Sequence, residues 1–257
     1  MKYFALIVLC TLVVSCCDCK TGNCNCKTDE YIDSIDSVPG VGPVGPTSYV
    51  ERVETNGLII LSPNYSKIDL VCGVMPQKSD NNVIFVAEAA YTEKCLEEFT
   101  HLNIAGYHVS NGVKYPGYKC TSNTGAFAYY AGRWEFCYDD YAAELDSAVT
   151  YHGAAFAQEM MIHEGKIKLT QRSDSNENVF RALCELHDSL CIIEAKSKLK
   201  FGDFKMKLKD IGVTEALYLD MGYGWNHAWY RPTDDSIVEL HPKGHNYCTN
   251  WITFYTQ

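Results

Sequence analysis

The chain has 257 residues, of which 47% are hydrophobic and 21% are charged. This balance is typical of a globular protein with one full core and excludes a disordered or fibrous chain. The formal net charge of -10 argues against a nucleic-acid-binding protein, because such a protein needs a basic face to displace counterions from phosphates. An anionic ligand would need a local Lys or Arg.

Residues 1–16 have the pattern of an export signal. One Lys precedes a short apolar run that ends in a small residue and a cysteine, and the run is too short to cross a bilayer as a stable helix. Its end, Val13-Val14-Ser15-Cys16, resembles the lipobox of bacterial lipoproteins, which predicts lipidation of Cys16. The alternatives are a plain signal peptide cut elsewhere and a short anchor. The prediction is an exported protein, lipid-anchored in the bacterial cell envelope, that contacts the membrane through its lipid only.

Residues 17–47 are predicted to form a flexible tether. They close with Val38-Pro-Gly-Val-Gly-Pro-Val-Gly-Pro46, a composition that buries little apolar area and changes direction at each Pro and Gly. The pairs Cys17-x-Cys19 and Cys24-x-Cys26 admit a metal site, but no histidine accompanies them. Exposed thiols or local disulfides are therefore favoured there.

Residues 48–257 are predicted to form one domain, because no repeat of fixed period and no second linker interrupts them. Apolar runs with strand character dominate this part of the chain, at 58–61, 68–74, 83–90, 125–130, 133–138, 156–162, 179–186, 190–195, 216–219, 237–241 and 251–255. The turn signals Ser110-Asn-Gly112 and Ala131-Gly132 predict hairpins.

Helical spacing of apolar residues occurs in three segments only, Glu93–His101, Asp139–Val149 and Phe201–Ile211. The last of them is followed by Gly212, a common helix stop. The predicted fold class is therefore α+β, a single domain with a large, mostly antiparallel sheet covered by a few helices.

The segment Glu215–Arg231 is unusual because an apolar run ends at a carboxylate and is followed by an unusual density of large polar and aromatic side chains. Asp220 precedes two glycines, and the candidate ligand-binding residues that follow are Gly222, Trp225, Asn226 and His227. Glycines at a strand end let a ligand approach the backbone closely. The alternative is that Asp220 only caps the local turn.

Two further charged residues interrupt apolar strands. Glu88 and Arg181 each lie among buried-type residues, where an unpaired charge is costly. One interpretation is a buried Glu88–Arg181 pair with a structural role. The other is a shared pocket, in which Arg181 binds phosphate or carboxylate and Glu88 acts as a base or sugar ligand.

The histidines give a weaker pattern. His108 lies among small residues and is a candidate for contact with a substrate, whereas the spacing of His227, His241, His245 and Cys248 fits no compact metal-ligand pattern. The sequence predicts no metal and no cofactor. No nucleophile elbow, phosphate loop or His-Glu-x-x-His motif occurs.

The order of motifs from Leu58 to the end resembles the phosphodiester glycosidase family, with its uncovering-enzyme-like domain. The matching parts, in order, are Glu88-Ala-Ala-Tyr91, Asn111-Gly112, Gly125-Ala-Phe127, Gly132-Arg-Trp134, Arg181-Ala-Leu183, Gly212-Val-Thr-Glu-Ala-Leu217 and Leu219-Asp220. The Leu-Asp-Met-Gly and Thr249-Asn-Trp251 segments look like those of a lipoprotein branch from gut Bacteroidetes. The family's Asp carries over to Asp220, but its Asn-Gly-Gly-aromatic loop is replaced at Glu88–Tyr91. The Ser of its Asp-Gly-Gly-Gly-Ser segment is absent as well.

The resemblance implies hydrolysis of a sugar-1-phosphodiester. Such a reaction needs a carboxylate near the anomeric centre, a cation on the phosphate and groups that bind sugar hydroxyls. Asp220 is the expected base or stabilising carboxylate, with Glu88 and His108 as a second acid/base pair. Arg181 is the expected phosphate ligand.

The remaining candidates, Trp225, Asn226, His227 and Gly222, are expected to orient the sugar or stack on it. A different reading is a non-catalytic, glycan-binding surface lipoprotein that uses Trp225, Trp229 and Trp251 as stacking platforms. A third is an enzyme that acts on another anomeric linkage. All three predict a carbohydrate or glycophosphodiester partner.

Overall fold

The structure is a computed structural model that describes residues 49–93, 98–118, 124–170 and 172–256. The predicted signal peptide with Cys16 and the predicted tether lie outside the described residues. The strands are β1 (Val50–Thr55), β2 (Leu58–Pro63), β3 (Lys67–Cys72), β4 (Val83–Glu88), β5 (His108–Ser110), β6 (Val113–Tyr115), β7 (Thr124–Tyr130), β8 (Arg133–Tyr138), β9 (Ala154–His163), β10 (Lys166–Ile167), β11 (Arg181–Leu186), β12 (Ser189–Ala195), β13 (Val213–Leu219), β14 (Ala228–Thr233), β15 (Ser236–Leu240) and β16 (Asn250–Tyr255). The helices are η1 (His101–Asn103, a 3₁₀ turn), α1 (Ala142–Thr150) and α2 (Phe201–Asp210).

Two-residue turns with positive φ at both positions form the hairpins. Asn111-Gly112 joins β5 to β6 and Ala131-Gly132 joins β7 to β8, so both predicted hairpins are confirmed. Asn56-Gly57 joins β1 to β2 in the same way. Positive φ at both central positions gives the turn a twist that matches paired strands, which is why Asn-Gly is favoured there.

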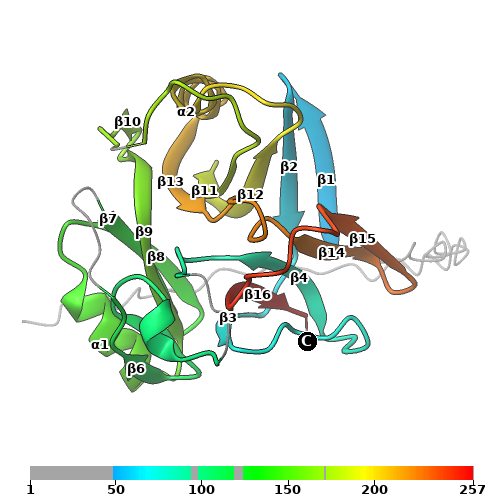
Figure 1. Cartoon of the computed structure of the whole chain (residues 1–257). Helices are drawn as coiled ribbons and strands as arrows, with labels where there is room; N and C mark the ends of the chain where they lie inside the picture. The colour runs from blue at the N-terminus through cyan, green and yellow to red at the C-terminus, as the bar shows by residue number, and fades with distance from the viewer. Residues whose placement is uncertain (1–48, 94–97, 119–123, 171, 257) are drawn as a thin grey trace, which may run out of the picture. The chain divides into compact units, whose positions relative to one another are not determined.

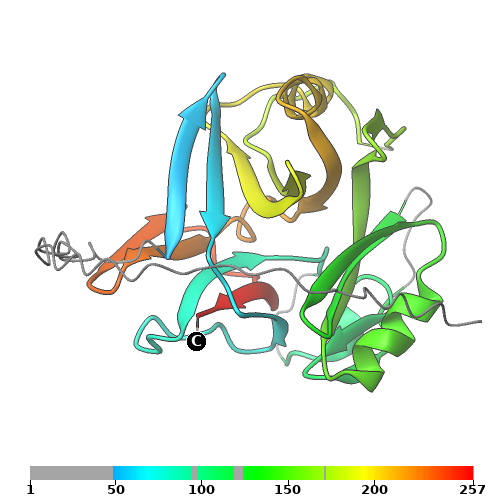
Figure 2. The same cartoon turned by 180° about the vertical axis from the view of Figure 1, so that it is seen from behind.

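The strands form two antiparallel sheets rather than one. The larger sheet has the order β1-β2-β12-β11-β13-β9-β5-β6, with β7, β8 and β10 attached at β9 and β7, and the smaller has the order β15-β14-β4-β16-β3. Figure 1 shows β4 and β16 running below the arch made by β2, β12, β11 and β13. From behind, β16 in red lies just below β4 in cyan (Figure 2). The α+β class with large antiparallel sheets is confirmed.

The helices cover the outer faces of the larger sheet. Phe201, Phe204 and Leu208 of α2 are fully buried in a cluster with residues of β11 and β13, at the top of Figure 1. Leu145 and Ala148 of α1 are buried against β5, β7 and β9. Two of the three predicted helices are therefore confirmed, each within three residues of its expected bounds. Within the described parts of the chain, no helix combines the length and the apolar character needed to cross a membrane.

Three expectations differ from the structure. The helix predicted at 93–101 is not formed at residues 98–100, and η1 follows as a single turn. The strand β1 was missed because all its residues after Val50 are exposed and no apolar alternation marks it. The strand β14 was missed because Trp229 to Arg231 looked like part of a polar binding loop, yet these residues are buried.

Candidate functional site

Asp220 and Glu88 meet where a strand of each sheet ends. Asp220 follows the last residue of β13, and its backbone N–H donates to the carbonyl oxygen of Ala89 at 3.2 Å. Ala89 follows Glu88, the last residue of β4. The side-chain amide of Gln158 in β9 donates to the same carbonyl at 3.2 Å. The Ala89 carbonyl oxygen thus links the ends of β4 and β13. The two carboxyl groups are close enough for the charge of Asp220 to raise the pKa of Glu88.

The Glu88 side chain has no exposed surface. Its Oε1 accepts hydrogen bonds from the backbone N–H of Thr249 and the side-chain amide of Asn250, both at 3.2 Å. The Cys248 side chain also contacts the Glu88 carboxyl, and among the described residues Oε2 has no partner that meets hydrogen-bond geometry. Burial raises the pKa of Glu88 well above its usual value, and the negative charge of Asp220 raises it further. Both effects favour the protonated form of Glu88, and Oε2 is the oxygen placed to carry the proton.

Asp220 is buried less completely, with 6% of its surface exposed. Burial raises its pKa to about 6, while hydrogen bonds from the backbone N–H groups of Gly222 and Met221 and the charge of Arg172 act in the opposite direction. The Gly222 N–H lies 3.0 Å from Oδ1. Asp220 is consequently an anion above about pH 6, beside a Glu88 carboxyl for which burial favours the protonated form. Two carboxyls with environments this different suit separate acid and base roles.

Arg172 supplies the cation of this site, and sequence reasoning missed it. Its guanidinium lies 4.4 Å from the ring centroid of Tyr218, donates a hydrogen bond to the Tyr91 hydroxyl and has its Nε 3.5 Å from Oε2 of Glu159. The side chain is half-buried, and its Nε has no hydrogen-bond partner. Arg172 sits in a polar, turn-rich segment with no apolar pattern, so no local signal marked it.

Arg181 does not have the predicted role of phosphate ligand. It is fully buried, and its Nε and Nη2 donate to Oε2 of Glu194 at 2.8 and 2.6 Å. The Nη2 also donates to the backbone oxygen of Asn226 at 3.2 Å, and His241 binds the other oxygen of Glu194 at 2.9 Å. The alternative Glu88–Arg181 pair is also wrong, since the partner is Glu194. Arg181 holds the segment after Asp220 in place.

The segment that follows Asp220 carries one exposed aromatic side chain. Tyr223 is 90% exposed, while Trp225 is half-buried and packs on the Tyr247 ring at a centroid distance of 4.9 Å. The Trp225 ring also lies against Gly222, where an added Cβ would meet it at 3.0 Å. The Asn226 side chain is half-buried. Trp225 and Asn226 therefore remain beside Asp220 as candidates for sugar contact.

The other predicted aromatic and imidazole groups are buried. Trp229 and Trp251 pack with Val83 and Val86 inside the smaller sheet, so they are not stacking platforms, contrary to the sequence interpretation. His227 is 5% exposed and its Nε2 bonds Oε2 of Glu239 at 3.1 Å. Burial lowers the His227 pKa, so the ring is neutral at physiological pH.

His108 belongs to a different cluster. Its Nε2 lies 2.9 Å from Nδ1 of His101, and its Nδ1 lies 3.2 Å from the carbonyl oxygen of Gly106. Burial lowers the His108 pKa to about 4. The hydrogen bonds described for His108 thus join it to His101 and Gly106, whereas the carboxyl pair at the strand ends consists of Asp220 and Glu88.

The described residues define an α+β domain of two antiparallel sheets with an unequal carboxyl pair and an arginine at the strand ends. No protein-family model matches the chain, and no curated protein matches it. The catalytic domain of zebrafish N-acetylglucosamine-1-phosphodiester alpha-N-acetylglucosaminidase, auto-inhibited by its pro-peptide, is similar over 81% of this chain and 82% of that one, with a TM-score of 0.50 and 11% identity. A hypothetical protein from Synechocystis is similar over 81% and 61%, with a TM-score of 0.49 and 10% identity. At 11% identity the first likeness shows a shared fold.

Proposed function

We propose that this chain is a hydrolase that cleaves a sugar-1-phosphodiester. The observation that carries the proposal is the Asp220–Glu88 pair with Arg172 beside it, since one ionised carboxylate, one protonated carboxyl and one cation are the groups that the reaction needs. The fold shared with a phosphodiester glycosidase domain adds support.

In the proposed reaction, water attacks the anomeric carbon and gives its proton to the Asp220 carboxylate. The bond between the anomeric carbon and the phosphate oxygen breaks, and the electron pair stays on the phosphomonoester, next to Arg172. Phosphate leaves readily as an anion, so Glu88 acts by donating a hydrogen bond from Oε2 rather than by full proton transfer. The products are a free sugar and a phosphomonoester, and Asp220 then loses its proton to solvent.

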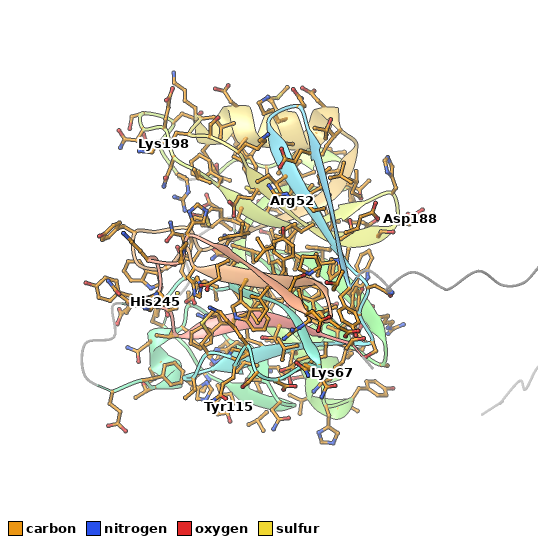
Figure 3. All side chains as sticks on the ribbon, turned by 90° about the vertical axis from the view of Figure 1, so that its right-hand side faces the viewer. Arg52, Lys67, Tyr115, Asp188, Lys198 and His245 are labelled. Atoms are coloured by element: carbon orange, nitrogen blue, oxygen red, sulfur yellow. The ribbon has the colours of Figure 1, made fainter. Side chains whose placement is uncertain are left out.

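The decisive variant is Asp220→Asn. Because Asn cannot take a proton, we expect kcat for a synthetic sugar-1-phosphodiester to fall by at least about 100-fold, with the Kd for that substrate unchanged within about twofold. Release of the free sugar is the measurement. Asp188→Asn is the control, because Asp188 is exposed; it is labelled on the right of the molecule in Figure 3. Its φ of 57° is positive, and Asn tolerates this conformation. Wild-type protein that binds sugars but turns over no phosphodiester would instead support a glycan-binding lipoprotein.

Arg172→Lys tests the phosphate contact. Lys keeps the charge but loses the planar fork, so we expect the phosphodiester Kd to rise by about tenfold while the Kd for the neutral sugar stays the same. Arg133→Lys is the matched control, since Arg133 is exposed on β8, and it should leave both Kd values unchanged. An equal loss for both ligands in Arg172→Lys would contradict the assignment.

We also propose that the protein is exported and anchored in the bacterial cell envelope through a lipid on Cys16. The support is the apolar run and the lipobox-like Val13-Val14-Ser15-Cys16. In a bacterial host, labelled fatty acid should be incorporated into the wild-type protein and not into Cys16→Ser. Equal labelling of the two proteins, or labelling of neither, would rule out this anchor.

A further inference from the structure

Cys72, His101 and His108 converge from three separate elements. Cys72 is the last residue of β3, His101 begins η1 and His108 begins β5. The cysteine sulfur and one ring nitrogen of each histidine all lie within 4.8 Å of one another. Among the described residues, this is the group of histidine, cysteine and acidic side chains with the spacing of metal ligands.

Neighbouring groups hold both rings in the orientation that metal ligation needs. His108 Nδ1 lies 3.2 Å from the Gly106 carbonyl oxygen, and a hydrogen bond donated there leaves the lone pair of Nε2 directed at the cluster. Such a bond from the far ring nitrogen is the usual support of a metal-binding histidine. The His101 ring lies flat on the Tyr115 ring at a centroid distance of 3.4 Å and an angle of 4°. Tyr115 is labelled in the lower part of Figure 3.

We propose that Cys72, His101 and His108 bind a divalent transition-metal ion of the zinc type. A thiolate and two imidazoles match the ligand preference of such ions, and three protein ligands leave a fourth position for water. The 2.9 Å contact between His101 Nδ1 and His108 Nε2 is the metal-free state, in which a proton lies between the nitrogens. Binding of the ion releases the Cys72 thiol proton. The His101 ring proton moves from Nδ1 to Nε2, which frees the Nδ1 lone pair for the ion.

This site is independent of the proposed hydrolase activity. Cys72 belongs to β3, which pairs with one edge of β16, where Cys72 lies opposite Asn250. Glu88 belongs to β4, which pairs with the other edge of β16, where Glu88 lies opposite Trp251. Through its three ligands, the ion would link η1 and β5 to the end of β3. Its loss would therefore lower stability even in a protein with no turnover, so failure of the two proposals can be told apart.

Cobalt titration of the full chain tests the site. The six cysteines of residues 1–26 are first replaced by serine, so that they do not bind the ion. We expect one equivalent of Co²⁺ to produce a thiolate-to-cobalt charge-transfer band and to raise the melting temperature. Cys72→Ser should abolish the band, and His108→Ala should weaken Co²⁺ binding at least about tenfold. Cys137→Ser, which removes another half-buried thiol, should leave the band unchanged.

A second measurement does not depend on whether His108→Ala folds. In the same full chain, Zn²⁺ should protect Cys72 from alkylation by iodoacetamide, measured for each cysteine by peptide mass spectrometry, and should leave the labelling of Cys137 unchanged. The proposal is overturned if the charge-transfer band is missing at one equivalent or persists in Cys72→Ser. Equal alkylation of Cys72 with and without Zn²⁺ also overturns it.

Discussion

The protonation state of Asp220 is set by opposing effects, of which burial is the largest. Burial favours the neutral carboxyl, while two backbone N–H groups and the Arg172 charge favour the carboxylate, and the resulting pKa is about 6. Glu88 has no such compensation from a cation and is buried completely, so its pKa lies well above the usual value. The pKa values of the two carboxyl groups therefore differ because their surroundings differ, not because one is an aspartate and the other a glutamate.

The raised pKa of Asp220 has a consequence for stability. Because the folded-state pKa of about 6 exceeds the ordinary value of 3.8, the folded protein holds a proton that the unfolded chain releases between these values. The stabilisation from that proton is present below pH 3.8 and lost as the pH rises through 6, by about 3 kcal/mol at 1.36 kcal/mol per pH unit. Asp220→Asn should therefore gain stability relative to wild type at pH 8 and much less at pH 4.

Thermal unfolding of both proteins between pH 4 and pH 8 measures this gain. Asp188→Asn serves as the control and should follow the wild-type curve. Parallel curves for wild type and Asp220→Asn would mean that the Asp220 carboxyl is not buried in solution.

At the scale of elements, the segment after β13 is held from two sides. Arg181 lies directly opposite Glu194 in the pairing of β11 with β12, and it donates a hydrogen bond to the Asn226 carbonyl oxygen. Tyr247 packs against Trp225 from the other side. A pair of this kind is costly to break, because the partner left behind is an unpaired buried charge. The segment is thus a fixed part of the site.

Gly224 is the position at which this segment has the least room. Its φ is +92°, and an added Cβ would lie 2.5 Å from Cδ2 of the Tyr247 ring. Gly132 also has a positive φ, +75°, but an added Cβ there meets nothing within 4 Å. We expect Gly132→Ala to reduce the free energy of unfolding by about 1 kcal/mol from backbone strain alone. Gly224→Ala should cost about 1 to 3 kcal/mol more, because it adds the clash.

Chemical denaturation of the two variants provides the measurement. Gly224→Ala should also weaken sugar binding, since the Trp225–Tyr247 stack must move, whereas Gly132→Ala should not. Equal losses of stability would show that the Tyr247 ring shifts at no cost.

At the scale of the whole molecule, the two sheets share one buried core. It includes Leu61 of β2, Phe85 of β4, Phe156 of β9 and Phe254 of β16, so neither sheet can keep its inner face buried alone. The Asp220 and Glu88 carboxyls lie at strand ends of the two sheets, and the distance between them depends on how the sheets pack. Residues that pack in this core are thus expected to influence activity as well as stability.

The compact unit that includes the sheets spans Val44–Gln257. We expect a chain of residues 48–257 to unfold at the same temperature as the full chain, within about 2 °C, and to keep the same kcat. Calorimetry and the phosphodiester assay on both forms check this. A large drop in the melting temperature of the shorter chain would show that residues 1–47 contribute to the fold.

Local patterns in the sequence determined much of this protein. The Asn-Gly and Ala-Gly turns, the apolar face of α2 and the position of Asp220 at a strand end follow from the properties of neighbouring residues, because hydrogen bonding and side-chain periodicity act over a few positions. Only the tertiary structure decided that there are two sheets, that Arg181 pairs with Glu194 rather than with phosphate, and that Arg172 lies beside Asp220. The physical reason is that the cost of burying a charge depends on partners far away in the chain, and these are fixed only when the sheets pack.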